Sequence, residues 1–404
     1  MYMKQKASAM IKAFCLLMAF LILLPAFSIS EKNTIYSLGS RGNEVLQINK
    51  RLKELRYQKK GNSKQYTKET QEAIRYFQRL NGLEETGNAD PQTVELLLSD
   101  SAKAAPWPTL VPLSTPAPPP APELAEVDHE GYLTAEGEYF YENEKEGQWI
   151  YKSNNLQIHI YKYRDTTLPL EWFETEIFSR NGETFHTVMT NPDKPATQYR
   201  YPYDIARKAK FVLGFSDDFY ADRVHQKQKT GVIIREGKLL YEKTHTKANH
   251  YLPNLDMMAQ YPDGRLEVYT CCEKTASELL SSGAVNVFSF GPIIIRNGEI
   301  NEQLYTYYRS TEPRQVLGMV EPGHYWLISV LGRMQSSRGT MLQRIAEMMK
   351  EKGVTQALNL DGGNTLALVF HGKILHGKAT YKKKTFYRTV TSLIGIGYTD
   401  QWNE

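Results

Sequence analysis

The stretch ALNLDGGNT at residues 357–365 organises the rest of the chain. Its apolar first half is typical of a strand, and Asn359 and Asp361 would share one face of that strand because they are two residues apart. Gly362 and Gly363 follow at once, and glycines leave backbone N–H groups accessible to a ligand. A strand that ends in an acid and two glycines is a common way to build a site. A tight turn in which Asp361 caps local amides is the alternative interpretation.

The residues around this stretch predict a large α+β domain over residues 131–404. Apolar runs recur at residues 156–163, 211–214 and 326–330, and glycine-containing turns separate or follow several of them. Helical spacing of apolar residues predicts a helix over residues 339–352, which Gly353 would end. Further helices are expected near residues 274–282 and 202–209. About 270 residues are enough for one sizeable core.

Composition limits the function classes only loosely. The chain has 404 residues, of which 41% are hydrophobic and 23% are charged, so we expect a globular protein of two or three domains. A net charge of +4 is too small to indicate a nucleic-acid partner. The one run of basic residues, at 382–384, is typical of a solvated loop.

The first thirty residues have the pattern of a signal peptide. Lys4, Lys6 and Lys12 precede an apolar run at residues 13–24, and small residues follow at 26–30. We therefore predict a secreted protein; because the apolar run is short for a membrane span, an uncleaved membrane anchor is the alternative. Removal of residues 1–30 leaves only Cys271 and Cys272. Adjacent cysteines rarely bridge each other, so we expect no disulfide framework.

Residues 34–99 predict a small domain of three helices, and residues 100–130 predict a linker. Apolar residues have helical spacing at 45–55 and 73–80, and Pro91 is placed to begin a short third helix. Eight prolines lie between residues 106 and 122. Such a segment cannot pack a core and favours an extended conformation. The predicted fold class is therefore multidomain, with a three-helix N-terminal domain, a proline-rich linker and a large α+β C-terminal domain.

The N-terminal segment resembles the peptidoglycan-binding domain of bacterial wall enzymes. The resemblance rests on LGSRGNEV at residues 38–45, AIRYFQ at 73–78 and GNAD at 87–90, with Asn49 where the family commonly has Gln. It implies attachment to peptidoglycan or another cell-wall glycan.

The C-terminal segment resembles the phosphodiester glycosidase family. Five stretches carry the resemblance, in the order of the family: SDDFY at 216–220, FSFGP at 288–292, EPRQVLG at 312–318, LGR at 331–333 and LNLDGGNT at 358–365. This family includes the lysosomal enzyme that removes N-acetylglucosamine from a sugar phosphodiester. The resemblance implies a hydrolase that acts on a phosphodiester-linked carbohydrate.

The bond to be broken suggests roles for the residues of these motifs. The departing phosphate monoester carries its charge well, so acid assistance matters less than for an ordinary glycoside. The protein must therefore supply a carboxylate near the anomeric carbon and groups that bind the phosphate. The candidates are Asp361 and Asp218 as nucleophile or base, Arg314 and Arg333 with the amides of Gly362 and Gly363 for the phosphate, and Asn359 and Thr365 for sugar hydroxyls.

Two departures from the family pattern keep a second function open. Ser216 stands where the family usually has Asn, and Leu331 stands where it usually has Asp. Asp217, an additional acid, is a candidate to compensate for Leu331. If it does not, the domain would be a catalytically inactive wall- or glycan-binding protein. No zinc motif is present; the metal ligands are unknown, and a divalent cation at Asp361 or at Asp217 and Asp218 is left open.

Overall fold

The computed structural model describes residues 34–58, 60–105, 117, 126–165, 168–245, 254–308, 310–381 and 384–402. The chain divides into two compact units, Met1–Thr109 and Leu110–Glu404, which are described separately below. The predicted signal peptide and most of the predicted linker lie outside the described residues. Within these ranges, no helix is both long and apolar enough to cross a membrane.

The described residues of the N-terminal unit form three helices, as the sequence predicts. They are α2 (Asn43–Glu54), α3 (Lys68–Asn81) and α4 (Pro91–Leu98). Side chains fix the start of two of them: Thr67 accepts a hydrogen bond from the Thr70 amide, and Asp90 accepts one from the Thr93 amide. The apolar faces of α2 and α3 meet in a core that contains Val45, Ile48, Leu52, Ile74 and Phe77.

The packed part of this unit extends beyond the expected boundary at residue 99. Ala105 is buried in the same core, and its amide donates a hydrogen bond of 2.9 Å to the Leu55 carbonyl. The C-terminal unit likewise includes residues before 131, because the Asp128 carboxylate forms an ion pair of 2.8 Å with Arg180.

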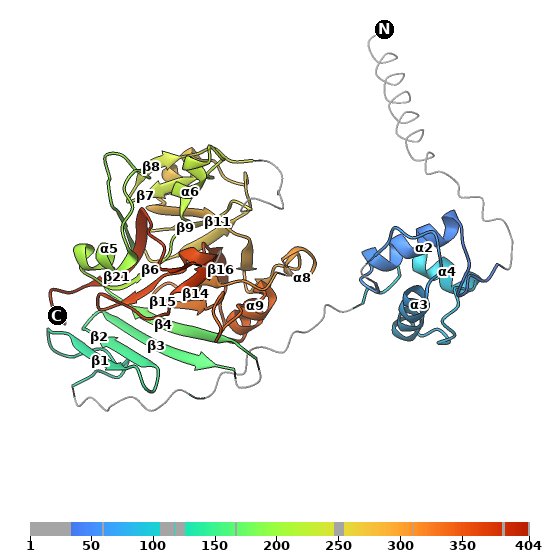
Figure 1. The fold of residues 1–404 in the computed structure, drawn as a ribbon, viewed down its shortest axis with the longest axis horizontal. Coiled ribbons are helices and arrows are strands. Elements are labelled where there is room, and N and C mark those ends of the chain that lie inside the picture. Colours follow the sequence, from blue (N-terminus) through green and yellow to red (C-terminus); the bar gives the residue numbers. More distant parts are fainter. Residues whose placement is uncertain are drawn as a thin grey trace, which may run out of the picture. The chain divides into compact units, whose positions relative to one another are not determined.

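Antiparallel sheets dominate the C-terminal unit (Figure 1). The largest has nine strands in the order β1 (Tyr139–Asn143), β2 (Gln148–Lys152), β3 (Leu156–Arg164), β4 (Glu171–Ser179), β15 (His324–Val330), β14 (Arg314–Glu321), β16 (Gln356–Leu360), β12 (Ile293–Arg296) and β13 (Glu299–Ile300). A second sheet has the order β10 (Leu266–Tyr269), β9 (Asp256–Gln260), β11 (Asn286–Phe290), β7 (Ile233–Arg235) and β8 (Lys238–Tyr241).

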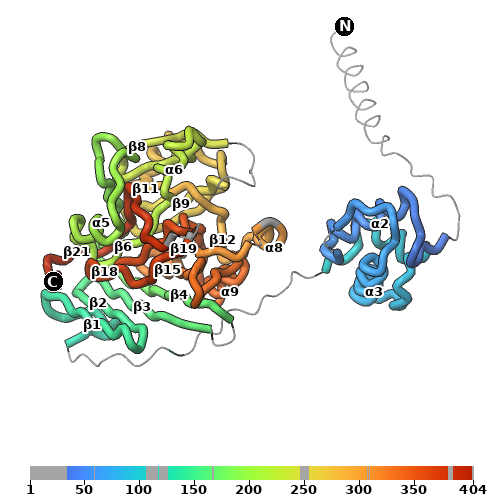
Figure 2. Tube along the Cα trace, in the orientation of Figure 1, coloured from blue at the N-terminus to red at the C-terminus, as the bar shows by residue number. Residues whose placement is uncertain are grey.

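The C-terminal residues build much of a third sheet. Its order is β18 (Lys373–Ile374), β17 (Leu368–Phe370), β6 (Phe211–Phe215), β21 (Ser392–Tyr398) and β5 (His186–Met189). The last part of the chain, red in Figure 2, therefore runs on both sides of β6. A separate hairpin, β19 (Ala379–Tyr381) and β20 (Lys384–Phe386), interrupts this segment.

Few helices accompany the sheets. The three predicted helices are present as α5 (Pro202–Ala209), α7 (Ala276–Ser281) and α9 (Leu342–Glu351). Two further helices, α6 (Tyr220–His225) and α8 (Leu304–Tyr307), were not predicted, because they are too short to show a periodic pattern in the sequence. A short 3₁₀ helix, η1 (Gly363–Thr365), follows β16.

Strand β16 lies inside the nine-stranded sheet and is covered on both faces. It pairs with β14 on one side and β12 on the other. Leu358 and Leu360 belong to the core shared with the other sheets, whereas Ala357 packs in the core beneath α9. A strand buried on both faces needs a continuous apolar run, which residues 357–360 supply except at Asn359. Its end therefore holds Asp361 in a rigid position.

Candidate functional site

Close packing against Pro313 explains the two glycines that follow Asp361. A Cβ atom on Gly362 would lie 2.5 Å from the Pro313 carbonyl oxygen, which is too close for any side chain. Gly363 has a φ of +59°, and its amide donates a 3.0 Å hydrogen bond to the same oxygen. The Gly363 amide is thus engaged within the fold, and the structure assigns both glycines a packing role.

The carboxyl group of Asp361 is partly buried beside two arginines. Burial raises its pKa to about 7, although the positive charges of Arg388 and Arg223 and a hydrogen bond with Thr365 act in the opposite direction. The Asp361 amide donates a 3.0 Å hydrogen bond to the Asp217 carbonyl, which fixes the turn. The Asp361 side chain therefore changes its protonation state near neutral pH, which is the pKa range suited to a general base at this pH.

Asp218 occupies a different environment, although it lies in a motif of the same resemblance. Its carboxylate is fully buried and accepts hydrogen bonds of 2.7 Å from Arg235 Nη2 and 2.9 Å from the Ser289 amide. Asp217 is buried beside it, hydrogen-bonds the Phe219 amide and Ser392, and lies 3.6 Å from Arg235 Nη2. Both acids therefore have partners inside the fold. The compensation for Leu331 that we expected from Asp217 has no support in this arrangement.

Arg223 and Arg388 are the basic residues whose charges act on Asp361, and the sequence analysis missed both. Arg223, on α6, is 4% exposed and donates to the carbonyls of Asp218, Thr230 and Ser289. Arg388 follows β20, lies over the ring of Phe219 and donates to Asp222 and Thr365. Neither belongs to a local motif. Only the pairing of sheets from distant segments brings them near Asp361.

Arg314 and Arg333 gather beyond Gly363. Arg333 donates through Nε and Nη2 to Glu312 and through Nη1 to Asn364, at 2.8–3.1 Å. Arg314 donates to the carbonyl and hydroxyl oxygens of Ser310. Burial lowers the pKa of Arg314 to about 10, so its guanidinium still carries a charge at neutral pH. The charges of Glu312 and Arg333 both act on Arg314, so the two predicted phosphate-binding arginines lie within electrostatic reach of each other, and Glu312 neutralises part of their charge.

Asn359, Thr365 and Ser216 hold the backbone in place around the turn. Asn359 is buried, and its Nδ2 donates a 2.8 Å hydrogen bond to the Gly291 carbonyl, while its Oδ1 has no partner among the described residues. Ser216 donates to the Thr365 carbonyl and accepts from the Ala367 amide. The Ser216 hydroxyl thus ties β6 to the segment after Asp361, which is a structural use of the position where the family usually has Asn.

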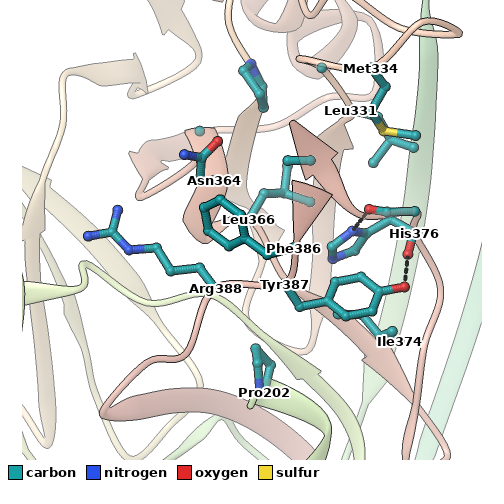
Figure 3. A pocket seen from close by; sticks show the side chains of 15 residues that line it. Pro202, Leu331, Met334, Asn364, Leu366, Ile374, His376, Phe386, Tyr387 and Arg388 are labelled. Atoms are coloured by element: carbon teal, nitrogen blue, oxygen red, sulfur yellow. Dashed lines mark hydrogen bonds between the residues drawn. The ribbon is translucent and has the colours of Figure 1, made fainter. Parts of the chain in front are cut away.

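A narrow cavity opens beside Gly363 and Asn364 (Figure 3). Arg388 lines one side, and Leu331, Met334, Leu366 and Phe386 give it an apolar interior. The space that water can occupy is about 20 Å³, which is room for roughly one molecule. A sugar therefore requires the walls of this cavity to move.

His376 contributes a further polar group to this cavity that the sequence analysis missed. Its Nδ1 lies 2.9 Å from the Gly377 carbonyl oxygen, and its Nε2 is buried without a partner among the described residues. Burial lowers the pKa of His376 to about 4, so the ring is neutral. The centroid of its ring lies 5.8 Å from that of the Tyr387 ring, and the hydroxyl of Tyr387 donates to the His376 carbonyl (Figure 3).

Among the described residues, no group of three or more His, Cys, Asp or Glu side chains could hold a metal ion. Asp217 and Asp218, one of the places where a cation was left open, both form ion pairs with Arg235. The residues that the structure describes therefore offer no ready set of ligands for the divalent cation left open by the sequence.

Two parts of the chain match known protein families. Residues 209–397 match the phosphodiester glycosidase family, and residues 41–97 match the putative peptidoglycan binding domain. The chain therefore contains a domain of each family, and both resemblances seen in the sequence are confirmed.

Similar proteins cover parts of the chain. The SPbeta prophage-derived uncharacterized protein YomE of Bacillus subtilis (strain 168) is 27% identical over 254 residues, which are 59% of this chain and 38% of that relative. The catalytic domain of zebrafish N-acetylglucosamine-1-phosphodiester alpha-N-acetylglucosaminidase, auto-inhibited by its pro-peptide, is 19% identical and has a TM-score of 0.47, covering 60% of this chain and 83% of that one. A hypothetical protein from Synechocystis is 12% identical with a TM-score of 0.40, covering 61% of this chain and 63% of that one.

Proposed function

We propose that this chain is a secreted, cell-wall-associated hydrolase that removes a sugar, N-acetylglucosamine, from a 1-phosphodiester linkage in a glycan or wall polymer. The observation that carries the proposal is the position of Asp361, directly after the buried strand β16 and within a motif of the matching family, where burial raises the pKa of its carboxyl. The phosphodiester glycosidase domain supplies the reaction class, and the peptidoglycan-binding domain supplies the attachment.

Asp361 acts on the anomeric carbon in this proposal, either directly as a nucleophile or as the base for a water molecule. Both roles use the ionised carboxylate. Arg388 lines the cavity, and its charge acts on Asp361, so it is placed to bind the phosphate of the same substrate. Arg333 and Arg314 are the second candidates for binding the phosphate. Arg333 also donates a hydrogen bond to Asn364 and so fixes its side chain.

The other predicted site residues support this site from within the fold. They are Asn359, Thr365, Gly362, Gly363, Asp217 and Asp218. The partners of Asp218, Arg235 and the Ser289 amide, leave its carboxylate no free oxygen for the substrate. We therefore assign Asp218 the role of a positioning residue. The unpartnered Nε2 of neutral His376 is placed to accept a hydrogen bond from a sugar hydroxyl.

An assay on N-acetylglucosamine 1-phosphodiesters tests the reaction. The full-length protein should release N-acetylglucosamine, with chelator and without it, because the described residues offer no metal cluster. A chelator that abolishes release would show that a cation is part of the site. Absence of release under both conditions would contradict the hydrolase.

One observation favours the second candidate, an inactive glycan-binding protein. Leu331 is 2% exposed and lines the cavity where the family usually has an Asp, so this wall has no polar group at that position. The binding-protein alternative predicts saturable binding of the phosphodiester without turnover, which calorimetry and the same assay separate.

Wall attachment is tested with the N-terminal unit alone. Its core is built within residues 45–105, so a fragment of residues 31–105 should fold and pellet with purified sacculi. A folded fragment that stays in the supernatant would contradict cell-wall association through this unit.

A further inference from the structure

Cys271 and Cys272 lie in the turn between β10 and α7, outside the motifs of the candidate site. Their sulfur atoms are 3.4 Å apart. Cys272 is exposed and has a φ of +68°, which is a backbone conformation that few residues other than glycine adopt. The turn thus holds two thiols side by side with one of them open to solvent.

Neighbouring groups fix this pair. The Cys271 thiol contacts the Thr244 hydroxyl at 2.9 Å, and both thiols contact the His245 carbonyl oxygen. The Cys271 amide donates a 3.1 Å hydrogen bond to Asp256, whose second oxygen accepts one of 3.0 Å from the Ile293 amide on β12. The position of the two sulfurs is therefore built into the fold rather than left to an open loop.

We propose that Cys271 and Cys272 form a redox modification site, which closes to a labile disulfide within the turn. An S–S bond is about 2.05 Å long, so the sulfurs need to approach by roughly 1.3 Å. Adjacent Cα atoms are about 3.8 Å apart, below the usual range of about 4.4–6.8 Å for bridged cysteines. The bond therefore stores strain, and strained, exposed disulfides are the ones that thiols reduce readily.

The oxidant is a small-molecule disulfide such as oxidised glutathione. The exposed Cys272 sulfur attacks one sulfur of that disulfide, which forms a mixed disulfide and releases one glutathione thiol. The Cys271 sulfur then attacks the Cys272 sulfur, which forms the internal bond and releases the second glutathione thiol. The two protein thiols lose two protons and two electrons, and the two glutathione thiols receive them. Burial raises the pKa of the Cys271 thiol, which agrees with Cys272 reacting first.

The experiment measures the oxidation state of this turn in the folded, full-length protein. The protein is equilibrated in buffers with increasing ratios of oxidised to reduced glutathione, and free thiols are then trapped with N-ethylmaleimide in acidic denaturant. Trypsin releases residues 266–274, a peptide that contains both cysteines and excludes Cys15. We expect this peptide to carry no maleimide and to be lighter by two hydrogen atoms in oxidising buffer. Excess reduced glutathione should restore the form with two maleimides.

A matched variant and a matched condition test whether the fold, and not only the adjacency of the two cysteines in the sequence, favours the disulfide. Cys272→Ser should never yield the lighter peptide and should leave Cys271 either free or joined to glutathione. Wild-type protein oxidised in denaturant should need a ratio of oxidised to reduced glutathione that is higher by about fivefold or more, because only the fold holds the sulfurs together. The proposal is overturned if both cysteines take up maleimide at every ratio. It is equally overturned if each sulfur carries its own glutathione, or if the native and denatured chains oxidise at the same ratio.

Discussion

Two regions of the molecule hold similar carboxyl groups in different environments. One is the cluster of Asp217, Asp218 and Arg235, and the other is the turn at Asp361. In the cluster, Asp218 gives both oxygens to hydrogen bonds with Arg235 and Ser289. At the turn, two arginines act on Asp361 through their charges, and burial still raises its pKa to about 7. A buried carboxylate with full hydrogen bonding contributes to structure, whereas one with incomplete compensation is available for chemistry. On this ground we propose Asp361, rather than Asp218, as the reactive group.

The largest effect should come from breaking the cluster. In Asp218→Asn, the buried Arg235 guanidinium loses the negative partner that lies 2.7 Å away. Removing one member of a buried ion pair typically costs about 3–5 kcal/mol of unfolding free energy. Denaturant unfolding of the C-terminal unit measures the loss. Glu299→Gln, which removes an exposed partner of Lys350, is the control and should change stability by less than about 1 kcal/mol. Unchanged stability with lost turnover would make Asp218 a catalytic carboxylate instead.

The next effect should come from Asp361→Asn, which keeps the shape and removes the charge. We expect turnover to fall by about 100-fold or more, because the ionised carboxylate is the working form. For the same reason, wild-type turnover should rise with pH through about 7. Steady-state kinetics of the wild type and the variant across about pH 5–9 measure both effects. Turnover that is retained by the variant would make Asp361 a residue that only caps the turn.

Stability gives an independent measure of the same group. The pKa of Asp361 is raised in the folded state, so the folded protein binds the proton more tightly than the unfolded chain. The wild type therefore loses unfolding free energy as pH rises from about 4 to about 7. Asp361→Asn lacks this loss and should be at least as stable as the wild type above pH 7. A variant that is less stable at every pH would contradict the raised pKa.

The contrast between the two carboxyl groups also shows what the sequence could predict. The apolar run before Asp361 and the adjacent glycines predict a strand and a turn from local pattern alone, and the structure contains both. Asp218 and Asp361 look alike in sequence, because the pairing of Asp218 depends on Arg235, which comes from another strand. Arg223 and Arg388 likewise reach Asp361 through the pairing of distant strands. Spacing along the chain predicts which residues share an element, but burial and pairing across sheets decide which acid has all its oxygens hydrogen-bonded.

A smaller effect should come from Arg388→Lys. The positive charge remains, but the planar group that can bind two phosphate oxygens is lost. We expect kcat/KM to fall by about tenfold, which corresponds to roughly 1.4 kcal/mol. Arg265→Lys, in an ion pair at the β9–β10 turn, is the control and should leave kcat/KM unchanged. Equal effects of the two variants would remove Arg388 from the proposed phosphate site.

The smallest effect should come from Glu312→Gln, on the far side of Gly363. Glu312 is partly exposed and pairs with Arg333 at 2.9 Å, so its loss should cost less than about 1 kcal/mol of stability. If Arg333 binds the phosphate, removing the competing carboxylate makes its guanidinium more available, and KM for the phosphodiester should fall by about twofold. Arg333→Lys in the same background should cancel this gain. A KM that rises in Glu312→Gln would mean that Glu312 holds Arg333 in the position that binds the phosphate. The arginines of the site would then depend on an ion pair, just as the Asp218 cluster does.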